Sequence, residues 1–441
     1  MGELKRDELS VRQERAVLVA LLLPGAEQEH PHPLAELSAL ATTAGARVVG
    51  HLIQRRESID AACYIGRGKA GQLAEQVHAN EADVIIFDND LSPAQIRELE
   101  RITDCKVVDR SELILDIFAT RARTHQARLQ VERAQLEYTT PRLRGMWTHL
   151  ERIVGAGGGT QAGSVGGIGT RGPGERQIEI DRRLVQNRLT ALGRELARID
   201  RRKLREVRNR RECFTVSIVG YTNSGKSTLM NALTGARVKV EDKLFATLDT
   251  RTRQWALGQG VSSLLSDTVG FVRDLPHHLV ASFRATLEEA INAHLLLHVA
   301  DVSNPAVERQ ITAVEKVLDE LGCADKPTVL LLNKTDALSD PSMLQVLRAS
   351  RPEAIPISAR TGEGLHLLIE DVLGRVRSQR VSAEVLIDFD DGAALSALHR
   401  DAEVIEQQVA DSRLRVKVAI APANLDRLSE TYTGMQIVRR G

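Results

Sequence analysis

Residues 220–227, Gly-Tyr-Thr-Asn-Ser-Gly-Lys-Ser, constrain this chain more than any other stretch. They have the form G-x-x-x-x-G-K-S, follow the apolar run 214–219, and open onto a helix-like segment at 228–233. A strand, a glycine-rich turn and a helix start form a cradle whose backbone N–H groups hold phosphate oxygens. A plain turn is the alternative, but the flanking elements favour a phosphate-binding loop in an α/β domain.

The loop and a later strand end supply candidate groups for the phosphates and a metal ion. Lys226 is placed to reach the β- and γ-phosphates, and the Ser227 hydroxyl to bind Mg²⁺. The expected nucleotide contacts here are Gly220, Tyr221, Thr222, Asn223, Ser224, Gly225, Lys226 and Ser227. Asp267, Thr268, Val269 and Gly270 follow the strand-like run 263–266. There Asp267 is expected to reach Mg²⁺ through water and the Gly270 N–H to touch the γ-phosphate, although D-x-x-G is also a common turn.

Two further stretches indicate which base is bound. Asn333, Lys334, Thr335 and Asp336 follow the apolar run 329–332. The Asp336 carboxylate can accept from guanine N1–H and the 2-amino group, whereas adenine would leave it unpaired. Lys334 would lay its alkyl stem over the base. Ser358, Ala359 and Arg360 follow 355–357 and can offer a backbone N–H to guanine O6. The four motifs in this order predict a GTP-binding domain.

The 441 residues are enough for several domains, and alternation of strand-like and helix-like runs predicts four. We expect an N-terminal parallel α/β domain at 1–120, a helical hairpin at 121–212, a GTPase domain at 213–380 and a ferredoxin-like βαββαβ domain at 381–441. Gly66–Lys69 at a helix start can be a second phosphate site, but a turn with a helix cap is the simpler interpretation.

Composition predicts a cytoplasmic protein. No apolar run is long enough to cross a bilayer, and we expect no signal peptide. The four cysteines, at 63, 105, 213 and 323, are too far apart for a zinc motif and are expected to be reduced thiols.

The net charge of zero hides a strongly basic segment. Residues 121–211 hold 21 Lys and Arg against 9 Asp and Glu, a net charge of +12. Apolar residues at helical spacing lie on both sides of a glycine-rich break at 155–174, which predicts an antiparallel hairpin: Leu129, Leu136, Leu143 and Leu150, then Leu184, Leu189, Leu192, Leu196, Ile199 and Leu204. A solvated coiled-coil face would explain the arginines, but the excess favours a nucleic acid partner.

A resemblance to a known family follows from motifs spread over nearly the whole chain. They are Gly-Ile-Gly-x-Arg-Gly-Pro-Gly-Glu at 167–175, Asp181-Arg182-Arg183, the phosphate-binding loop, Phe245-Ala246-Thr247-Leu248-Asp249, and Asp-Thr-Val-Gly followed by Phe271. Together they resemble the HflX family of ribosome-associated GTPases. The resemblance implies a monomeric GTPase that binds the 50S subunit and its rRNA through the hairpin. It also implies the splitting of stalled or stress-damaged 70S ribosomes.

The resemblance also assigns roles around the nucleotide. Phe245, Ala246, Thr247, Leu248 and Asp249 would form the first switch, with Thr247 as the second Mg²⁺ hydroxyl; spacing alone leaves Thr250 and Thr252 as competitors. Phe271 stands where many GTPases carry a water-orienting Gln, so unassisted hydrolysis should be slow. Asn223 is a candidate for holding K⁺ against the phosphates, and a polar cap of the loop is the equal alternative.

Two other functions remain open from the residues. One is a GTPase partner in tRNA or rRNA modification or in ribosome biogenesis, for which the sequence holds no recognisable catalytic constellation. The other is a regulatory protein adaptor, which leaves the basic hairpin unexplained.

Overall fold

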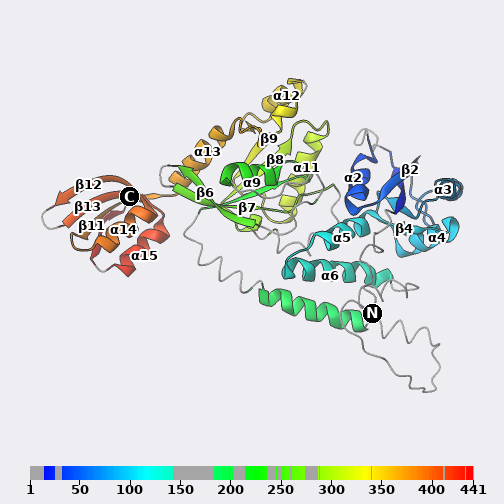
Figure 1. Ribbon diagram of the computed structural model, residues 1–441, viewed down its shortest axis with the longest axis horizontal. Helices are drawn as coiled ribbons and strands as arrows, with labels where there is room; N and C mark the ends of the chain where they lie inside the picture. The colour runs from blue at the N-terminus through cyan, green and yellow to red at the C-terminus, as the bar shows by residue number, and fades with distance from the viewer. Residues whose placement is uncertain are drawn as a thin grey trace, which may run out of the picture. The chain divides into compact units, whose positions relative to one another are not determined.

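The computed structural model describes residues 14–24, 32–142, 183–199, 201, 214–235, 245, 251–258, 261–273, 287, 289–338, 340–410, 413–432 and 434–440 (Figure 1). The chain divides into two compact units. The first comprises Met1–Ala197, Lys243–Phe245 and Leu275–Phe283, and the second comprises Arg198–Asp242, Ala246–Asp274 and Arg284–Gly441.

The first unit contains a four-stranded parallel sheet in the order β2-β1-β3-β4. Its elements in chain order are β1 (Arg15–Leu22), α2 (Ala35–Ala44), β2 (Arg47–Arg55), α3 (Arg67–Ala79), β3 (Val84–Phe87), α4 (Pro93–Thr103), β4 (Lys106–Val108) and α5 (Arg110–Arg121). Strands β1 and β3 are buried on both faces, as parallel strands covered by helices require. The parallel α/β domain expected from the sequence is confirmed.

Local signals set the helix starts in this sheet. Helix α4 begins with a capping box, in which the Ser92 side chain accepts from the Gln95 N–H and Gln95 bonds back to Ser92. Helix α3 begins at Arg67, directly after Gly66 in an extended conformation. Gly66–Lys69 therefore forms the turn and helix start that the sequence favoured over a phosphate site.

Two helical segments after the sheet run antiparallel. Helix α6 (His125–Thr139) is followed by the single turn η2 (Thr140–Arg142), and residues 183–199 form the second helix. Ion pairs join Arg188 to Glu132 at 2.6 Å and Glu195 to His125 at 2.8 Å. The later residue of the second helix therefore contacts the earlier residue of α6, which shows that the two helices run in opposite directions. One predicted position is wrong, because the Leu184 side chain is 61% exposed and Val185 is buried instead. A shift of one residue turns a helical side chain by about 100°, which is enough to leave the buried stripe.

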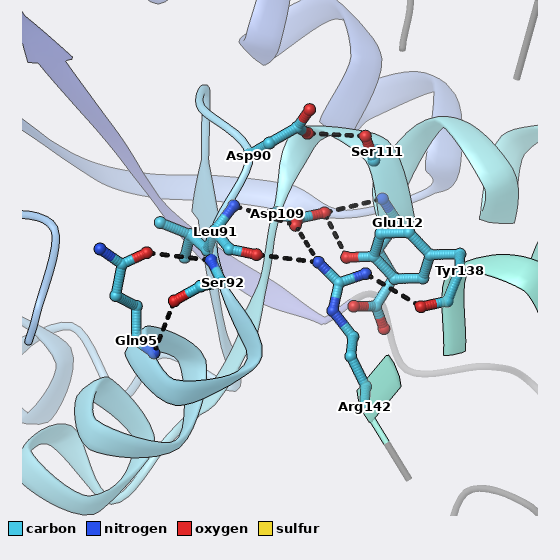
Figure 2. A network of polar contacts seen from close by, with 9 residues as sticks. All are labelled: Asp90, Leu91, Ser92, Gln95, Asp109, Ser111, Glu112, Tyr138 and Arg142. Carbon is cyan, nitrogen blue, oxygen red and sulfur yellow. Dashed lines mark hydrogen bonds and ion pairs between the residues drawn. The ribbon is translucent and has the colours of Figure 1, made fainter. Parts of the chain in front are cut away.

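A buried polar network fixes the end of α6 to the α/β domain (Figure 2). The Arg142 guanidinium donates to Asp109 Oδ2 at 2.8 Å and to the Leu91 carbonyl at 2.9 Å, and it lies 3.3 Å from the centre of the Tyr138 ring. Tyr138 donates its hydroxyl proton to Asp109 Oδ1 at 2.5 Å. Burial raises the pKa of Asp109 to about 6, against the lowering effect of Arg142. The network holds the start of the segment that leads into residues 143–182.

Replacing Arg142 with Met is expected to destabilise the first unit by about 3 kcal/mol at pH 7, because it leaves the Asp109 carboxylate buried without its cation. Below about pH 6 the carboxyl is neutral in both proteins, so the difference should shrink at pH 5. Hydrogen exchange of the α5 and α6 amides at the two pH values measures this loss of stability. The matched control is Arg133→Met, whose partly exposed pair with Glu137 should cost well under about 1 kcal/mol. Equal losses in the two variants would refute this account.

The second unit contains a six-stranded sheet in the order β10-β9-β8-β5-β7-β6, in which only β6 runs antiparallel to its neighbour. Its strands are β5 (Thr215–Gly220), β6 (Arg251–Gly258), β7 (Val261–Asp267), β8 (Leu295–Asp301), β9 (Thr328–Asn333) and β10 (Ile355–Pro356). Its helices are α9 (Lys226–Thr234), α11 (Val307–Glu320), the turn η3 (Thr335–Ala337), α12 (Ser342–Ser350) and α13 (Leu365–Ser378). Parallel strands place their carboxyl ends at one edge, where ligands of such sheets bind.

Within the second unit, the described residues from 381 to 440 build a separate four-stranded antiparallel sheet in the order β12-β13-β11-β14. The elements are β11 (Val381–Asp388), α14 (Gly392–Asp401), β12 (Ala402–Ala410), β13 (Arg413–Ile420), α15 (Pro422–Thr431) and β14 (Met435–Arg440). Both helices lie on one face (Figure 1), where Ala383, Val385 and Ile387 of β11 are buried by alternation along the strand.

Candidate nucleotide-binding site

The glycine-rich loop joins β5 to α9 at the carboxyl end of the sheet. Two of its glycines have no room for a side chain. A Cβ on Gly220 would lie 2.3 Å from the Val299 carbonyl oxygen, and one on Gly225 would lie 2.2 Å from Asn333 Nδ2. Both also have positive φ, 151° and 96°. The loop therefore depends on glycine at these positions to turn sharply against β8 and β9.

Lys226 is the first residue of α9, and its ammonium is held inside the loop. Nζ donates to the Tyr221 carbonyl at 2.7 Å, and the residue is only 6% exposed. Burial lowers the pKa of Lys226 to about 8, while the nearby Asp267 carboxylate opposes that shift. The cation is thus fixed among the backbone groups that face a phosphate in loops of this kind.

Ser227 and Asp267 are brought together from α9 and the end of β7. The Ser227 hydroxyl donates to Asp267 Oδ2 at 2.8 Å. A hydroxyl and a carboxylate side by side are the kind of hard oxygen donors that Mg²⁺ prefers. The residues present therefore fit a Mg²⁺ ion. In the same loop, the buried hydroxyls of Thr222 and Ser224 have no hydrogen-bond partner among the described residues. They are therefore able to bond to a ligand.

Gly270 and Phe271, which follow β7, contact the phosphate-binding loop. A Cβ on Gly270 would come within 2.8 Å of both Lys226 Nζ and the Thr222 Cα, so only glycine fits. The Thr222 N–H donates to the Phe271 carbonyl at 2.7 Å, and the Phe271 N–H donates to the Gly220 carbonyl at 3.1 Å. The Phe271 side chain is 2% exposed. The backbone of Gly270 thus stands beside the lysine, while the phenyl ring faces the interior.

Asn333 has a structural role that the sequence analysis missed. Its Nδ2 donates to the Ser224 carbonyl at 2.8 Å, and its Oδ1 accepts from the Ala359 N–H at 2.9 Å. It is 1% exposed. One side chain therefore ties the phosphate-binding loop to the loop that follows β10. Only the motif order, which puts both loops at one sheet edge, hinted at this bridge.

The residues expected to contact a guanine base lie beside this bridge. Asp336 accepts from the Ser358 hydroxyl at 2.6 Å, and Arg360 Nη1 lies 3.7 Å from its second oxygen. Lys334 has a left-handed backbone, φ 67°, and pairs with Asp301 at 2.6 Å. The Ser358 N–H donates to the Glu363 carbonyl, and the Ala359 N–H donates to Asn333 Oδ1. Of the three residues expected to offer a backbone N–H to guanine O6, this leaves Arg360 as the candidate.

The structure does not describe every residue that the sequence assigned to the site. Ala246, Thr247, Leu248 and Asp249 lie outside the described residues, as do Arg182 and the glycine-rich break. Phe245 is described, and its ring packs on Phe118 in the first unit. Asn223 is exposed with a left-handed backbone, φ 60°. Its proposed K⁺ contact and its capping alternative both stay predictions.

A phosphate-binding loop, a paired serine and aspartate, and an Asn-Lys-x-Asp turn at one sheet edge define a P-loop GTPase. Three family models match successive parts of the chain: a GTP-binding GTPase N-terminal model at 32–119, a GTP-binding GTPase middle-region model at 121–211, and a 50S ribosome-binding GTPase model at 215–334. The chain belongs to the HflX family of GTPases, and it hydrolyses GTP to GDP and phosphate.

Relatives in that family align over most of both chains. The GTPase HflX of Caldanaerobacter subterraneus is 41% identical over 424 residues, 96% of this chain and 94% of the relative. The GTPase HflX of Escherichia coli K12 is 43% identical over 375 residues, 84% of each chain. Among solved structures, the complex of SsGBP with GDP shares 25% identity and covers 82% of this chain and 98% of its own, with a TM-score of 0.46. That score is too low to bear on the family assignment.

Within the described parts of the chain, none of the helices combines the length and apolar character needed to span a bilayer.

Proposed function

We propose that this GTPase acts in the cytoplasm, binds the large ribosomal subunit through segment 121–212, and splits stalled or stress-damaged 70S ribosomes. The observation that carries the proposal is the +12 charge of 121–211 within a chain of the HflX family. A polyanion such as rRNA offers phosphates to which arginine can bind bidentately. The description of the matched model, a 50S ribosome-binding GTPase, points in the same direction.

The antiparallel course of the two helices supports a hairpin that carries residues 143–182 between them. The Arg188–Glu132 and His125–Glu195 pairs set that course. The Arg142 network fixes the first helix to the α/β domain, so the segment beyond it starts from a rigid base. A rigid base lowers the ordering cost of binding, which favours a segment that inserts into a folded RNA.

In the site, we assign guanine recognition to Asp336 and Lys334 and place the metal hydroxyls at Ser227 and Thr247. A bound Mg²⁺ would neutralise charge on the phosphates during attack by water. Lys226 holds the β- and γ-phosphates, and its burial strengthens that attraction. Asn223 is assigned a K⁺ contact.

We assign the C-terminal sheet to the ferredoxin-like class. Its element order is βαββαβ and its strand order is β12-β13-β11-β14, with both helices on one face. We propose no catalytic role for this domain.

Co-sedimentation with ribosomal subunits tests the docking proposal. The full-length protein should pellet with 50S subunits when loaded with a non-hydrolysable GTP analogue and less with GDP, and it should convert 70S ribosomes to subunits. Equal binding to 30S subunits, or none to either, would favour the alternative of a protein adaptor. Binding to 50S precursors alone would favour a biogenesis role.

Arg182 and Arg183 provide a sharper test of the hairpin. Changing both to Glu should weaken 50S binding by at least tenfold at low salt and flatten its salt dependence, because fewer counterions are released. GTP affinity in solution should not change. The matched control reverses two exposed cations of the GTPase domain, Lys316 and Arg348, which alters net charge equally. If both double variants lose the same affinity, general electrostatic attraction explains the binding and the hairpin is not the interface.

A further inference from the structure

The residues that follow β7 stay hydrogen-bonded to the phosphate-binding segment after the strand has ended. Strands β5 and β7 pair in parallel as far as Ile218 and Asp267. Beyond that point the Thr268 hydroxyl, which is fully buried, donates to the Ile218 carbonyl at 2.7 Å. The Phe271 N–H then donates to the Gly220 carbonyl at 3.1 Å. The two segments therefore remain joined beyond the end of the sheet.

Tyr221 adds a side-chain hydrogen bond to these contacts. The Arg273 N–H donates to the phenol oxygen of Tyr221 at 2.7 Å. Tyr221 is only 6% exposed, so water competes little for this bond. The carbonyl of the same residue accepts from Lys226 Nζ at 2.7 Å. Tyr221 thus contacts the loop lysine through its backbone and Arg273 through its side chain.

Gly270 lies within the segment that these bonds hold. Its backbone is so close to the loop that a Cβ would lie 2.8 Å from Lys226 Nζ. The bond of Thr268 precedes Gly270 in the chain, and the bonds made by the Phe271 and Arg273 N–H groups follow it. Because the segment is held on both sides of Gly270, the direction of the Gly270 N–H relative to the lysine is held as well.

We propose that Tyr221 is a positioning residue, whose hydroxyl group holds the segment after Gly270 and so orients the Gly270 N–H for the γ-phosphate of GTP. The inference rests on the expected contact between Gly270 and the γ-phosphate, and it is independent of ribosome binding. An N–H group that is oriented before binding loses less conformational freedom on binding. GDP has no γ-phosphate, so its affinity gains nothing from this orientation. The Tyr221 hydroxyl therefore favours GTP over GDP.

Hydrogen exchange in the nucleotide-free, full-length protein tests the bond itself. Tyr221→Phe removes the phenol oxygen and keeps the ring. Residue-resolved exchange of the Arg273 amide should become roughly 2- to 10-fold faster, the range expected for the loss of one neutral hydrogen bond. Exchange of the Phe271 amide should change less, because its acceptor is the Gly220 carbonyl.

Nucleotide affinity tests the consequence of the bond. Tyr221→Phe should bind a non-hydrolysable GTP analogue roughly 2- to 10-fold more weakly, while its affinity for GDP should not change. Unchanged GDP binding also shows that the variant is folded. The matched control is Tyr138→Phe, which removes a similarly buried hydroxyl that donates to Asp109 in the first unit. It should keep the wild-type ratio of analogue affinity to GDP affinity.

Three results with Tyr221→Phe would overturn the proposal. Unaltered exchange of the Arg273 amide would mean that the bond does not form in solution. Faster exchange with an unchanged affinity ratio would limit the bond to a structural role. A ratio that rises would mean that the bond holds the segment in an arrangement that opposes GTP binding.

Gly270→Ala tests the contact through which Tyr221 is proposed to act. The added methyl group would lie 2.8 Å from Lys226 Nζ, so the variant should lose more affinity for the analogue than for GDP. If it keeps the wild-type affinity ratio, Gly270 does not contact the γ-phosphate and the positioning role of Tyr221 fails with it. Absence of ribosome binding would refute the proposed docking alone, because neither measurement involves ribosomes.

Discussion

Large ribosomal subunits are expected to accelerate GTP hydrolysis by this protein by about 10³- to 10⁵-fold, the range found when a partner completes a GTPase site in trans. The free protein should turn over slowly, because the position after Gly270 holds a phenylalanine. Its ring is 2% exposed and its backbone is bonded to the phosphate-binding loop, so it has no group with which to orient water. Single-turnover release of phosphate, with and without 50S subunits, measures the factor.

The control for this measurement is an equal concentration of 30S subunits, which should not accelerate the reaction. Fast hydrolysis by the isolated protein would contradict the prediction, since it would require a water-orienting group within this chain. The Arg182 and Arg183 double variant should show little acceleration at low subunit concentration. It should recover at high concentration, because docking and chemistry are separate steps.

The same assay tests the K⁺ assignment of Asn223. Replacing K⁺ with Na⁺ at constant ionic strength should slow hydrolysis, and Asn223→Ala should remove the difference. Constant ionic strength is needed because screening alone changes subunit binding. Equal rates in the two salts would reject the K⁺ contact and leave the argument from Phe271 untouched.

Asp336→Asn is expected to shift base preference from guanine to xanthine by a combined factor of roughly 10⁴. In the proposed site the carboxylate would accept from guanine N1–H and the 2-amino group, whereas an amide would present a donor that suits the 2-oxo group of xanthine. The change should preserve the fold, because the Asn oxygen can still accept from the Ser358 hydroxyl, now 2.6 Å from Asp336 Oδ1. Competition binding of GTP and xanthosine triphosphate measures the ratio.

Asp340→Asn is the matched control, since Asp340 lies four residues further on and accepts from Ser342 at the start of α12. It should keep the wild-type preference for GTP. If Asp336→Asn also keeps it, base recognition does not depend on Asp336. If Asp336→Asn binds neither nucleotide, measuring its melting temperature distinguishes a lost site from a lost fold.

Much of the fold was predictable because its signals are local. Alternation of strand-like and helix-like runs predicted the parallel α/β domain at the start of the chain, and the structure has that sheet with its connecting helices. In the second helix of the basic segment, the expected buried stripe was displaced by one residue. It included Leu184, which is exposed, instead of Val185, which is buried.

The sequence by itself determined that residues 220–227 form a turn between a strand and a helix, and that 267–270, 333–336 and 358–360 follow other strands. That much follows from chemistry between near neighbours in the chain, together with the rule that parallel strands end at one edge. Only the tertiary structure decided that Asn333 joins Ser224 to Ala359, that Arg142 neutralises Asp109, and that Phe245 packs on Phe118. These partners are separated by 26 to 127 positions in the numbering of the chain. No local pattern encodes such pairs, because they form only when sheets and helices from distant segments pack together and bury the groups between them.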